Sequence, residues 1–496
     1  MRGGHAAILD RRLSGILLHP TSLPGPGPAG NLGVEAYHFI DFLVSAGQRV
    51  WQVLPLGPTH DDLSPYQTLS AHAGNPCIIS WERVVEAGWL LEDALDQAGT
   101  AEPQRGERLL TWALEGFRAH ADAAERAAYE AFCQEEAWWL EDYVLYRALR
   151  RALGNRPWFQ WPAPLRDRVP ADLDEARGVL AETLERLRLG QYLFRVQWLA
   201  LKRHANSRGV HLFGDLPIFV AHDSADVWAQ REFFRLDESG RPTVVAGVPP
   251  DYFSTEGQRW GNPLYDWERL EADGFAWWIQ RMRTQLVLFD LVRIDHFRGF
   301  QAFWEIPAGE ETAVNGHWRE APGDALFRAL DETLGPLPVV AEDLGTITPE
   351  VHALRSDHGL PGMRVLQFAF DGNPGNPYLP HNHARDTVVY TGTHDNDTTS
   401  GWFRSLDPAL RNRILDYLGQ PRDPMPWALI RAALASVSCL SMIPMQDVMG
   451  LDSSHRMNVP GVSDGNWQWR FEWSQVPPEA AGRLRHLTAL YGRLQG

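Results

Sequence analysis

Short apolar runs recur along the chain, and each of them ends in a polar or acidic cluster. The runs are nearly continuous and rich in Val, Leu and Ile, which is typical of parallel strands buried on both faces. Stretches with helical spacing, such as 264–285 and 323–334, lie between most of them. Strands that alternate with helices in this way predict a (β/α)8 barrel, an α/β fold. The eight expected strands are 15–20, 49–56, 209–217, 286–295, 337–343, 362–370, 386–397 and 440–448.

Three segments interrupt this alternation. Residues 88–190 are dense in Ala, Leu, Glu and Arg with helical spacing, which predicts a mostly helical insertion after the second strand. Residues 219–262, after the third strand, are rich in Pro, Gly and aromatic residues, and we expect an irregular insertion that covers the barrel mouth. The apolar run 300–307 is expected in a loop after the fourth strand. The predicted barrel with its loops therefore comprises residues 1–87 and 191–496.

Composition narrows the range of partners. The 496 residues include 46 basic and 63 acidic ones, and the net charge of −17 argues against a nucleic-acid partner. No apolar run approaches the roughly 20 residues that cross a bilayer, and the first residues lack the apolar stretch of a secretory signal. We therefore expect no membrane partner and a cytoplasmic location. Three cysteines in so long a chain also argue against a disulfide framework and a four-thiolate metal site.

Acidic residues follow three of the expected strands, where the catalytic groups of such barrels lie. Asp295, Glu342 and Asp395 end the fourth, fifth and seventh strands. Arg293 lies two residues before Asp295 and so on the same side of the strand, where its charge is expected to lower the pKa of Asp295 and keep it ionised. Glu342 follows an apolar run, and this drier setting is expected to raise its pKa. An ionised carboxylate facing a protonated one is the pair used in glycoside chemistry; helix capping or pairing with Arg is the alternative.

Flat aromatic rings point to the same ligand class. The chain contains 21 tryptophans, whose rings have apolar faces and one polar N–H. Such rings suit sugars, which are apolar on their faces and hydroxylated at their rims, although many of these tryptophans could instead pack helices.

Longer runs give the sequence a specific resemblance. It resembles the 4-α-glucanotransferases called amylomaltases or disproportionating enzymes, which form glycoside hydrolase family 77 of the α-amylase clan. The resemblance extends nearly from end to end. The runs that carry it are LLHPTSLPG at 17–25, WQVLPLGPT at 51–59, SPYQ at 64–67, AGNP at 73–76, FGDLPIFV at 213–220, VAGVPPDYFS at 245–254, GQRWGNPLY at 257–265, RIDHFRGF at 293–300, AEDLG at 341–345, YTGTHDNDT at 390–398 and RMNVPG at 456–461.

The resemblance implies a retaining transfer of a 1,4-α-glucan segment to the 4-hydroxyl of glucose or another glucan. Asp295 would be the nucleophile, Glu342 the general acid/base, and Asp395 the carboxylate that stabilises the oxocarbenium-like transition state. The implied donors and acceptors are maltooligosaccharides, amylose or glycogen-like glucans, with no cofactor and no metal. The residues at positions that resemble substrate-binding ones are Arg293, His394, Tyr66, Asp215, Asp251, Gln258 and Trp260.

The sequence departs from the family pattern in one loop. His60-Asp61-Asp62-Leu63 replaces the usual Gly-aromatic-Gly turn, and this removes an aromatic contact expected of an accessory glucan site. His383 and Val462 also differ from the Tyr and Thr that the family leads us to expect.

Other chemistries fit the sequence less well. The letters of a dinucleotide motif occur at 25–30, but Pro26 and Pro28 remove amide donors that a pyrophosphate needs. The G-x-S-x-G letters at 461–465 follow no expected strand, so a nucleophile elbow is not predicted. A hydrolase of the α-amylase type and a glycan-binding protein with an inactive site remain as alternatives to the transferase.

Overall fold

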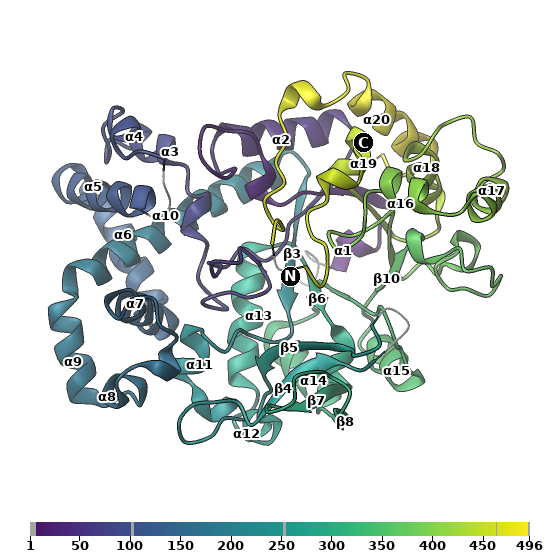
Figure 1. The fold of residues 1–496 in the computed structure, drawn as a ribbon. Coiled ribbons are helices and arrows are strands. Elements are labelled where there is room, and N and C mark those ends of the chain that lie inside the picture. The colour runs from purple at the N-terminus through teal and green to yellow at the C-terminus, as the bar shows by residue number, and fades with distance from the viewer. Residues whose placement is uncertain (1–5, 101–103, 251–253, 463, 495–496) are drawn as a thin grey trace.

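The computed structural model describes residues 6–100, 104–250, 254–462 and 464–494, and its centre is a nearly closed barrel of parallel strands (Figure 1). Each strand coincides with one of the eight expected runs, so the predicted (β/α)8 barrel is confirmed. The last and first strands of the sheet meet where the Ala341 N–H donates to the Pro361 carbonyl over 2.8 Å. In spatial order the strands are β10 (Gly362–Val365), β11 (Thr387–Tyr390), β12 (Leu440–Pro444), β1 (Leu13–Leu17), β2 (Val50–Gln52), β3 (His211–Pro217), β6 (Leu291–Asp295) and β9 (Val339–Ala341).

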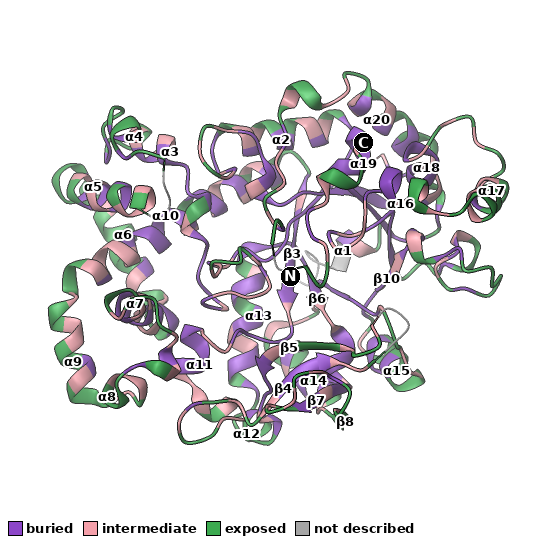
Figure 2. Ribbon diagram, in the orientation of Figure 1, coloured by how far each residue is buried: buried purple, intermediate pink, exposed green. Residues whose placement is uncertain are grey.

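Apolar side chains from these strands fill the barrel. Phe213, Leu291, Val340, Met363 and Val388 belong to one buried cluster, to which all eight barrel strands contribute side chains. The short helix α1 (Ala6–Leu9) adds to this cluster at the start of the chain. Figure 2 shows the buried strands at the centre of the molecule, with exposed residues on the outer helices. The barrel is therefore a packed core that holds the strand ends in fixed positions.

Helices cover the outside of the barrel, as expected from the sequence. The expected helix at 264–285 is in fact two helices, because Gly274 and Phe275 adopt left-handed backbone angles of 64° and 57° in φ. Among the described residues, no helix has the length and the apolar composition that crossing a bilayer requires. The helices around the barrel are α2 (Val34–Ser45), α12 (Trp267–Ala272), α13 (Ala276–Leu288), α14 (Gly323–Leu334), α15 (Pro349–Asp357), α16 (Thr399–Ser405), α17 (Pro408–Tyr417), α18 (Trp427–Ala435), α19 (Met445–Met449) and α20 (Ala480–Leu490).

The segment between β2 and β3 is helical, and it forms the group of helices to the left of the barrel in Figure 1. Residue 190, the expected end of the insertion, lies inside one long helix, α10, which ends at Ser207, shortly before β3. The division of the chain at 88 and 190 stays a prediction. The helices of this segment are α3 (Trp81–Glu86), α4 (Ala94–Gln97), α5 (Gln104–His120), α6 (Ala123–Glu135), α7 (Ala137–Ala152), α8 (Ala163–Arg166), α9 (Pro170–Val179) and α10 (Ala181–Ser207), and α11 (Ala225–Ala229) follows β3.

A second sheet corrects two expectations from the sequence. The 219–262 insertion is not irregular throughout but contributes two antiparallel strands, and the run at 300–307 is a strand rather than a loop. The two insertions are joined by one pairing, between residues 244–248 and residues 302–307, which is why neither sequence segment reveals the whole sheet by itself. The four strands, in spatial order, are β5 (Gln258–Pro263), β4 (Val244–Val248), β7 (Ala302–Pro307) and β8 (His317–Glu320).

Several tryptophans are buried in the core of the protein. Five of them are among the largest fully buried side chains of the protein, so the high tryptophan content serves the core as well as any ligand. They are Trp51, Trp158, Trp198, Trp228 and Trp278.

Candidate active site

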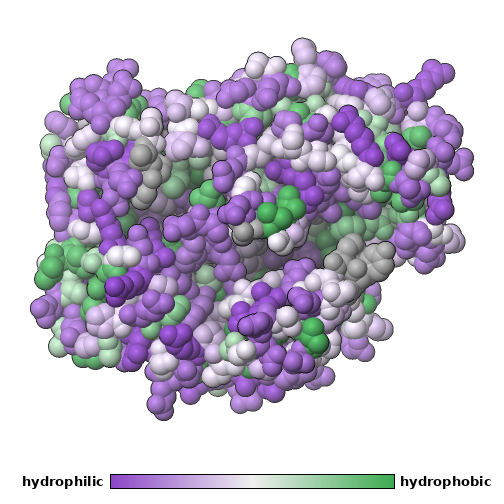
Figure 3. Space-filling view, viewed as in Figure 1, coloured by the Kyte–Doolittle hydropathy of each residue, from purple (hydrophilic) through white to green (hydrophobic). Residues whose placement is uncertain are grey.

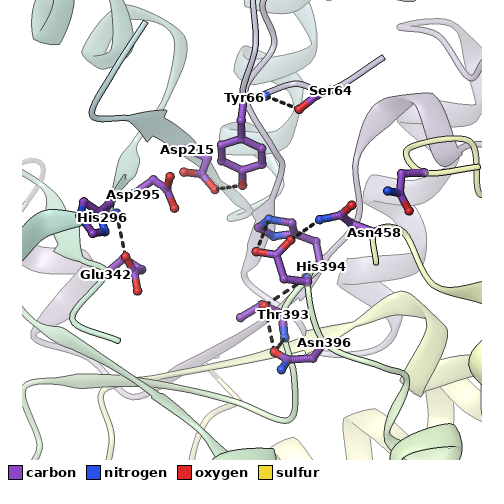
Figure 4. Close-up of polar contacts among 12 residues, drawn as sticks. Ser64, Tyr66, Asp215, Asp295, His296, Glu342, Thr393, His394, Asn396 and Asn458 are labelled. Atoms are coloured by element: carbon purple, nitrogen blue, oxygen red, sulfur yellow. Dashed lines mark hydrogen bonds and ion pairs between the residues drawn. The ribbon is translucent and has the colours of Figure 1, made fainter. Parts of the chain in front are cut away.

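The three carboxylates lie at the carboxyl ends of barrel strands. Asp295 is the last residue of β6, Glu342 directly follows β9, and Asp395 lies in the loop after β11. Because the carboxyl ends of parallel strands share one rim of the barrel, the three groups face one space. Figure 4 shows Asp295 and Glu342 near one another, with Tyr66 and His394 beside them, and Figure 3 shows that the largely hydrophilic surface is hollowed near the centre of this face.

Arg293 links two carboxylates beneath this space. It donates through Nη1 to Asp215 Oδ2 over 2.6 Å and through Nη2 to Asp295 Oδ1 over 2.7 Å. Asp215 also accepts the Tyr66 hydroxyl, over 2.9 Å. The pairing of β3 with β6 sets Asp215 opposite Arg293, so the sheet register itself builds this contact. Since the Arg293 and Asp215 side chains are only 6% and 1% exposed, their mutual bond satisfies charges that water cannot reach.

Burial governs the pKa of Asp295, contrary to the expectation from the sequence. The neighbouring Arg293 favours the ionised form, as expected, but burial outweighs it and raises the pKa of Asp295 to about 6. The negative charges of Asp215 and Asp395 act in the same direction as burial. The physical reason is that Asp295 is partly withdrawn from water and that Asp215 and Asp395 add negative charge around the same cation.

Glu342 has the pKa rise that the apolar run before it predicts. Burial and the charge of Asp295 raise its pKa to about 8, although Arg293 opposes the shift. Two backbone N–H groups bind its oxygens, His296 to Oε2 over 2.7 Å and Leu344 to Oε1 over 3.0 Å. His296 reaches Oε2 from a left-handed conformation with a φ of 53°. The two carboxyl groups therefore titrate as a pair, in which Glu342 is the harder group to ionise.

Asp395 has the opposite shift. Burial by itself would raise its pKa, but His394 and Asn458 together lower it to about 2. Asn458 Nδ2 donates to Oδ1 over 2.6 Å, and His394 Nε2 lies 3.2 Å from Oδ2. Arg456 donates to the Asp395 carbonyl over 2.9 Å. Reasoning from the sequence missed Asn458 and Arg456, because they follow the last strand and only the resemblance of the RMNVPG run drew attention to them.

The other expected substrate-binding residues lie on both sides of the carboxylates. The rings of Tyr66 and His394 are stacked, with centroids 5.2 Å apart and planes inclined by 15°. Trp260 lies edge-on to His296 at 4.8 Å and donates to Gln258 Oε1 over 3.1 Å, and both Trp260 and Gln258 belong to β5. Asp251 lies outside the described residues. No cluster of three or more His, Cys, Asp or Glu side chains suited to a metal occurs within the described ranges.

Comparisons with known proteins show the family of the chain. The family model for glycoside hydrolase family 77, described as 4-alpha-glucanotransferase, matches residues 18–475. The chain belongs to this family. A 4-alpha-glucanotransferase of Thermus thermophilus is 52% identical, covering 97% of this chain and 99% of that protein, and one of Synechocystis is 48% identical, covering 98% and 99%. A solved amylomaltase of Streptococcus agalactiae, in complex with acarbose, has a TM-score of 0.93 and 37% identity, covering 97% of this chain and all of that one.

Membership of the family confirms two predictions. The chain is an enzyme of the transferase class, and the expected 4-α-glucanotransferase function holds. The roles of the individual residues and the course of the reaction are separate questions, which the geometry of the site addresses.

Proposed function

We propose that this glucanotransferase moves a segment of a 1,4-α-glucan to the 4-hydroxyl of glucose or another glucan through a covalent glucosyl-enzyme on Asp295. The observation that carries this proposal is geometric: Arg293 binds Asp295 over 2.7 Å at the end of one strand, and Glu342 lies buried at the end of the next strand of the barrel. Burial fits this arrangement, because it raises the pKa of Asp295 to about 6 and that of Glu342 to about 8. Between these values Asp295 is ionised and Glu342 holds a proton. This is the combination that a retaining mechanism requires of its nucleophile and its acid.

In the first step, Asp295 attacks the anomeric carbon while the bond to the leaving sugar breaks. Arg293 binds Oδ1, so the attack falls to Oδ2. Glu342 transfers its proton to the leaving 4-oxygen, and a glucosyl ester with inverted configuration results. Direct attack predicts that the two carboxyl groups lie about 5–5.5 Å apart, without room for a water molecule between them.

In the second step, Glu342 acts as a base. It accepts the proton of the acceptor 4-hydroxyl, whose oxygen attacks the anomeric carbon and releases Asp295. The second inversion restores the α configuration. Asp395 remains ionised throughout. We propose that it binds the ring hydroxyls and stabilises the positive charge that develops in the transition state.

Transfer in place of hydrolysis requires a bound acceptor and a site that excludes water. We propose that the 245–262 loop provides this shield, with Pro249, Pro250 and Trp260. Support comes from Trp260, whose ring lies against His296 beside the acid Glu342. Tyr252 and Phe253, also expected in this shield, lie outside the described residues.

Glycosyl fluorides test the two carboxylate roles separately, because fluoride leaves without a proton from the enzyme. With α-glucosyl fluoride, Glu342→Gln is expected to form the covalent ester and to accumulate it, while Asp295→Asn forms none. Intact-protein mass spectrometry detects the adduct. Glu350→Gln, an exposed exchange of the same kind on α15, is the matched control and is expected to turn over like the wild type. An adduct on Asp295→Asn would disprove the assignment.

A product ladder separates transfer from hydrolysis. From maltotriose, the wild-type enzyme is expected to release glucose together with longer oligosaccharides, whereas a hydrolase of the α-amylase type produces no longer products. We propose maltooligosaccharides, amylose and glycogen-like glucans as the natural donors and acceptors. We also propose a cytoplasmic location, and the free thiols of Cys133 and Cys439 support it because thiols persist in reducing compartments.

A further inference from the structure

Trp467 has a backbone conformation that bulky residues rarely adopt. Its φ is 65°, in the left-handed region, where glycine and asparagine are usual. Its own N–H donates to the Met457 carbonyl over 2.7 Å. A conformation of this kind persists only where the surrounding structure enforces it, and such residues concentrate at functional sites.

The segment that carries Trp467 is fixed to the active site. Asn458, earlier in the same segment, binds the Asp395 side chain. The buried Asn466 side chain accepts the Val459 N–H over 2.9 Å and donates to the Val462 carbonyl over 2.8 Å. These bonds hold the backbone on both sides of the turn and so determine where the Trp467 ring lies.

The Trp467 ring lies against two expected sugar-binding side chains. Its centroid is 5.9 Å from the Tyr66 ring and 5.9 Å from the His394 ring, while Tyr66 and His394 are stacked on each other. Trp467 is only partly buried, although it also packs against the cluster of Leu17, Leu54 and Met457. An indole ring combines apolar faces with one N–H donor, and this combination suits the apolar face and the hydroxyl rim of a glucose unit.

The position of the proposed acid, Glu342, indicates which glucose unit of the substrate would contact the Trp467 ring. Glu342 protonates the leaving oxygen, so the leaving sugar lies on the side of Glu342 and His296. Figure 4 shows these residues on one side of Tyr66, and His394 and Asn458 towards the other. Trp467 contacts His394 and thus lies on the side of the glucose units that stay on the enzyme.

We propose that Trp467 is a specificity-determining residue that binds the second glucose unit of the transferred segment. This inference rests on the proposed function and extends it, because it explains how the enzyme would favour segments longer than one glucose. The strained backbone of Trp467 and the hydrogen bonds of Asn466 hold the ring in place before the glucan binds.

Two donors of different length test this contact. α-Glucosyl fluoride fills the site of the reacting glucose alone, and α-maltosyl fluoride adds the second unit. Trp467→Ala is expected to lower kcat/KM for maltosyl fluoride by about tenfold or more, as when an aromatic contact is truncated, and to leave glucosyl fluoride within about twofold. Trp467→Phe keeps a ring and is expected to retain most of the preference. Asparagine tolerates the left-handed backbone better than alanine, so Trp467→Asn provides a second variant without the ring if the alanine variant misfolds.

The ratio of kcat/KM for maltosyl fluoride to kcat/KM for glucosyl fluoride decides the outcome. An equal loss with both fluorides would mean that Trp467 only packs against His394, and no loss with either would mean that it contacts no substrate; each result overturns the proposal. Trp138→Ala, an exposed tryptophan on α7 in the helical segment, is the matched control and is expected to leave both values unchanged. A wild-type enzyme that uses neither fluoride would refute the proposed function itself, a result distinct from any change in the ratio.

Discussion

Replacing Asn458 by alanine perturbs the third carboxylate while it leaves all three carboxylates in place. Asn458 Nδ2 lies 2.6 Å from Asp395 Oδ1, and the residue is 9% exposed. A hydrogen bond to a charged group contributes about 1.5–3 kcal/mol. In the free enzyme, water can replace the lost donor, because the Asp395 side chain is 45% exposed. A bound glucan displaces that water, so the loss is felt mainly in the complex and the transition state.

The expected effect is therefore a decrease in kcat/KM of about tenfold to a hundredfold, since 1.4 kcal/mol corresponds to a factor of ten. The assay is the initial rate of disproportionation of maltotriose. Losing the donor raises the pKa of Asp395, but this value starts at about 2, so the pH profile near neutrality keeps its shape.

A matched control removes the same type of bond elsewhere. Asn206 Nδ2 donates to Asp290 Oδ2 over 2.8 Å, just before β6 and so at the amino end of the barrel. Asn206→Ala is expected to lower Tm without a comparable change in kcat/KM. Wild-type kcat/KM in Asn458→Ala, or an equal loss in Asn206→Ala, would refute the reasoning.

Three further predictions follow from the contacts and charges described above. The kcat/KM for maltotriose should rise with pH through about 6, as Asp295 ionises, and fall above about 8, as Glu342 loses its proton; a profile flat across this range would contradict the assignment. Arg493→Ala should lower the free energy of unfolding in urea by about 3 kcal/mol or more, because the buried guanidinium donates to five backbone carbonyls near β1 and β12, while kcat stays unchanged. Trp260→Ala should raise the ratio of hydrolysis to transfer with maltotriose, and an unchanged ratio would mean that this side chain is not part of the shield.

The barrel could be predicted from the sequence because each of its strands is a continuous apolar run, and because the runs alternate with helical segments. The antiparallel sheet could not be predicted in the same way. Its strands β4 and β7 are adjacent in space, but they belong to two insertions that β6 separates along the chain. Pairing between distant segments depends on where the barrel places their ends in space, and a local pattern of residues carries no information on those positions.

The positions of the candidate carboxylates could also be predicted, but their protonation could be predicted only in part. The rise in the pKa of Glu342 follows from the apolar run before it. The rise for Asp295 does not follow from its neighbour Arg293, because it depends on burial and on Asp215 and Asp395, which other strands supply. Trp467 and Asn458 come from a segment without strand or helix periodicity, so only a three-dimensional structure shows what they contact.

In the mechanism that we propose, the shared charge of the site would also explain how Glu342 can act first as an acid and then as a base. The negative charge of Asp295 is one cause of the raised pKa of Glu342. When Asp295 becomes a neutral ester, this contribution disappears while Arg293 remains, and the pKa of Glu342 falls. In the proposed reaction, Glu342 would thus hold its proton tightly until the leaving oxygen takes it, and it would stay ionised while the ester persists. When the acceptor attacks and Asp295 regains its charge, the affinity of Glu342 for a proton rises again at the moment when the acceptor hydroxyl must lose one.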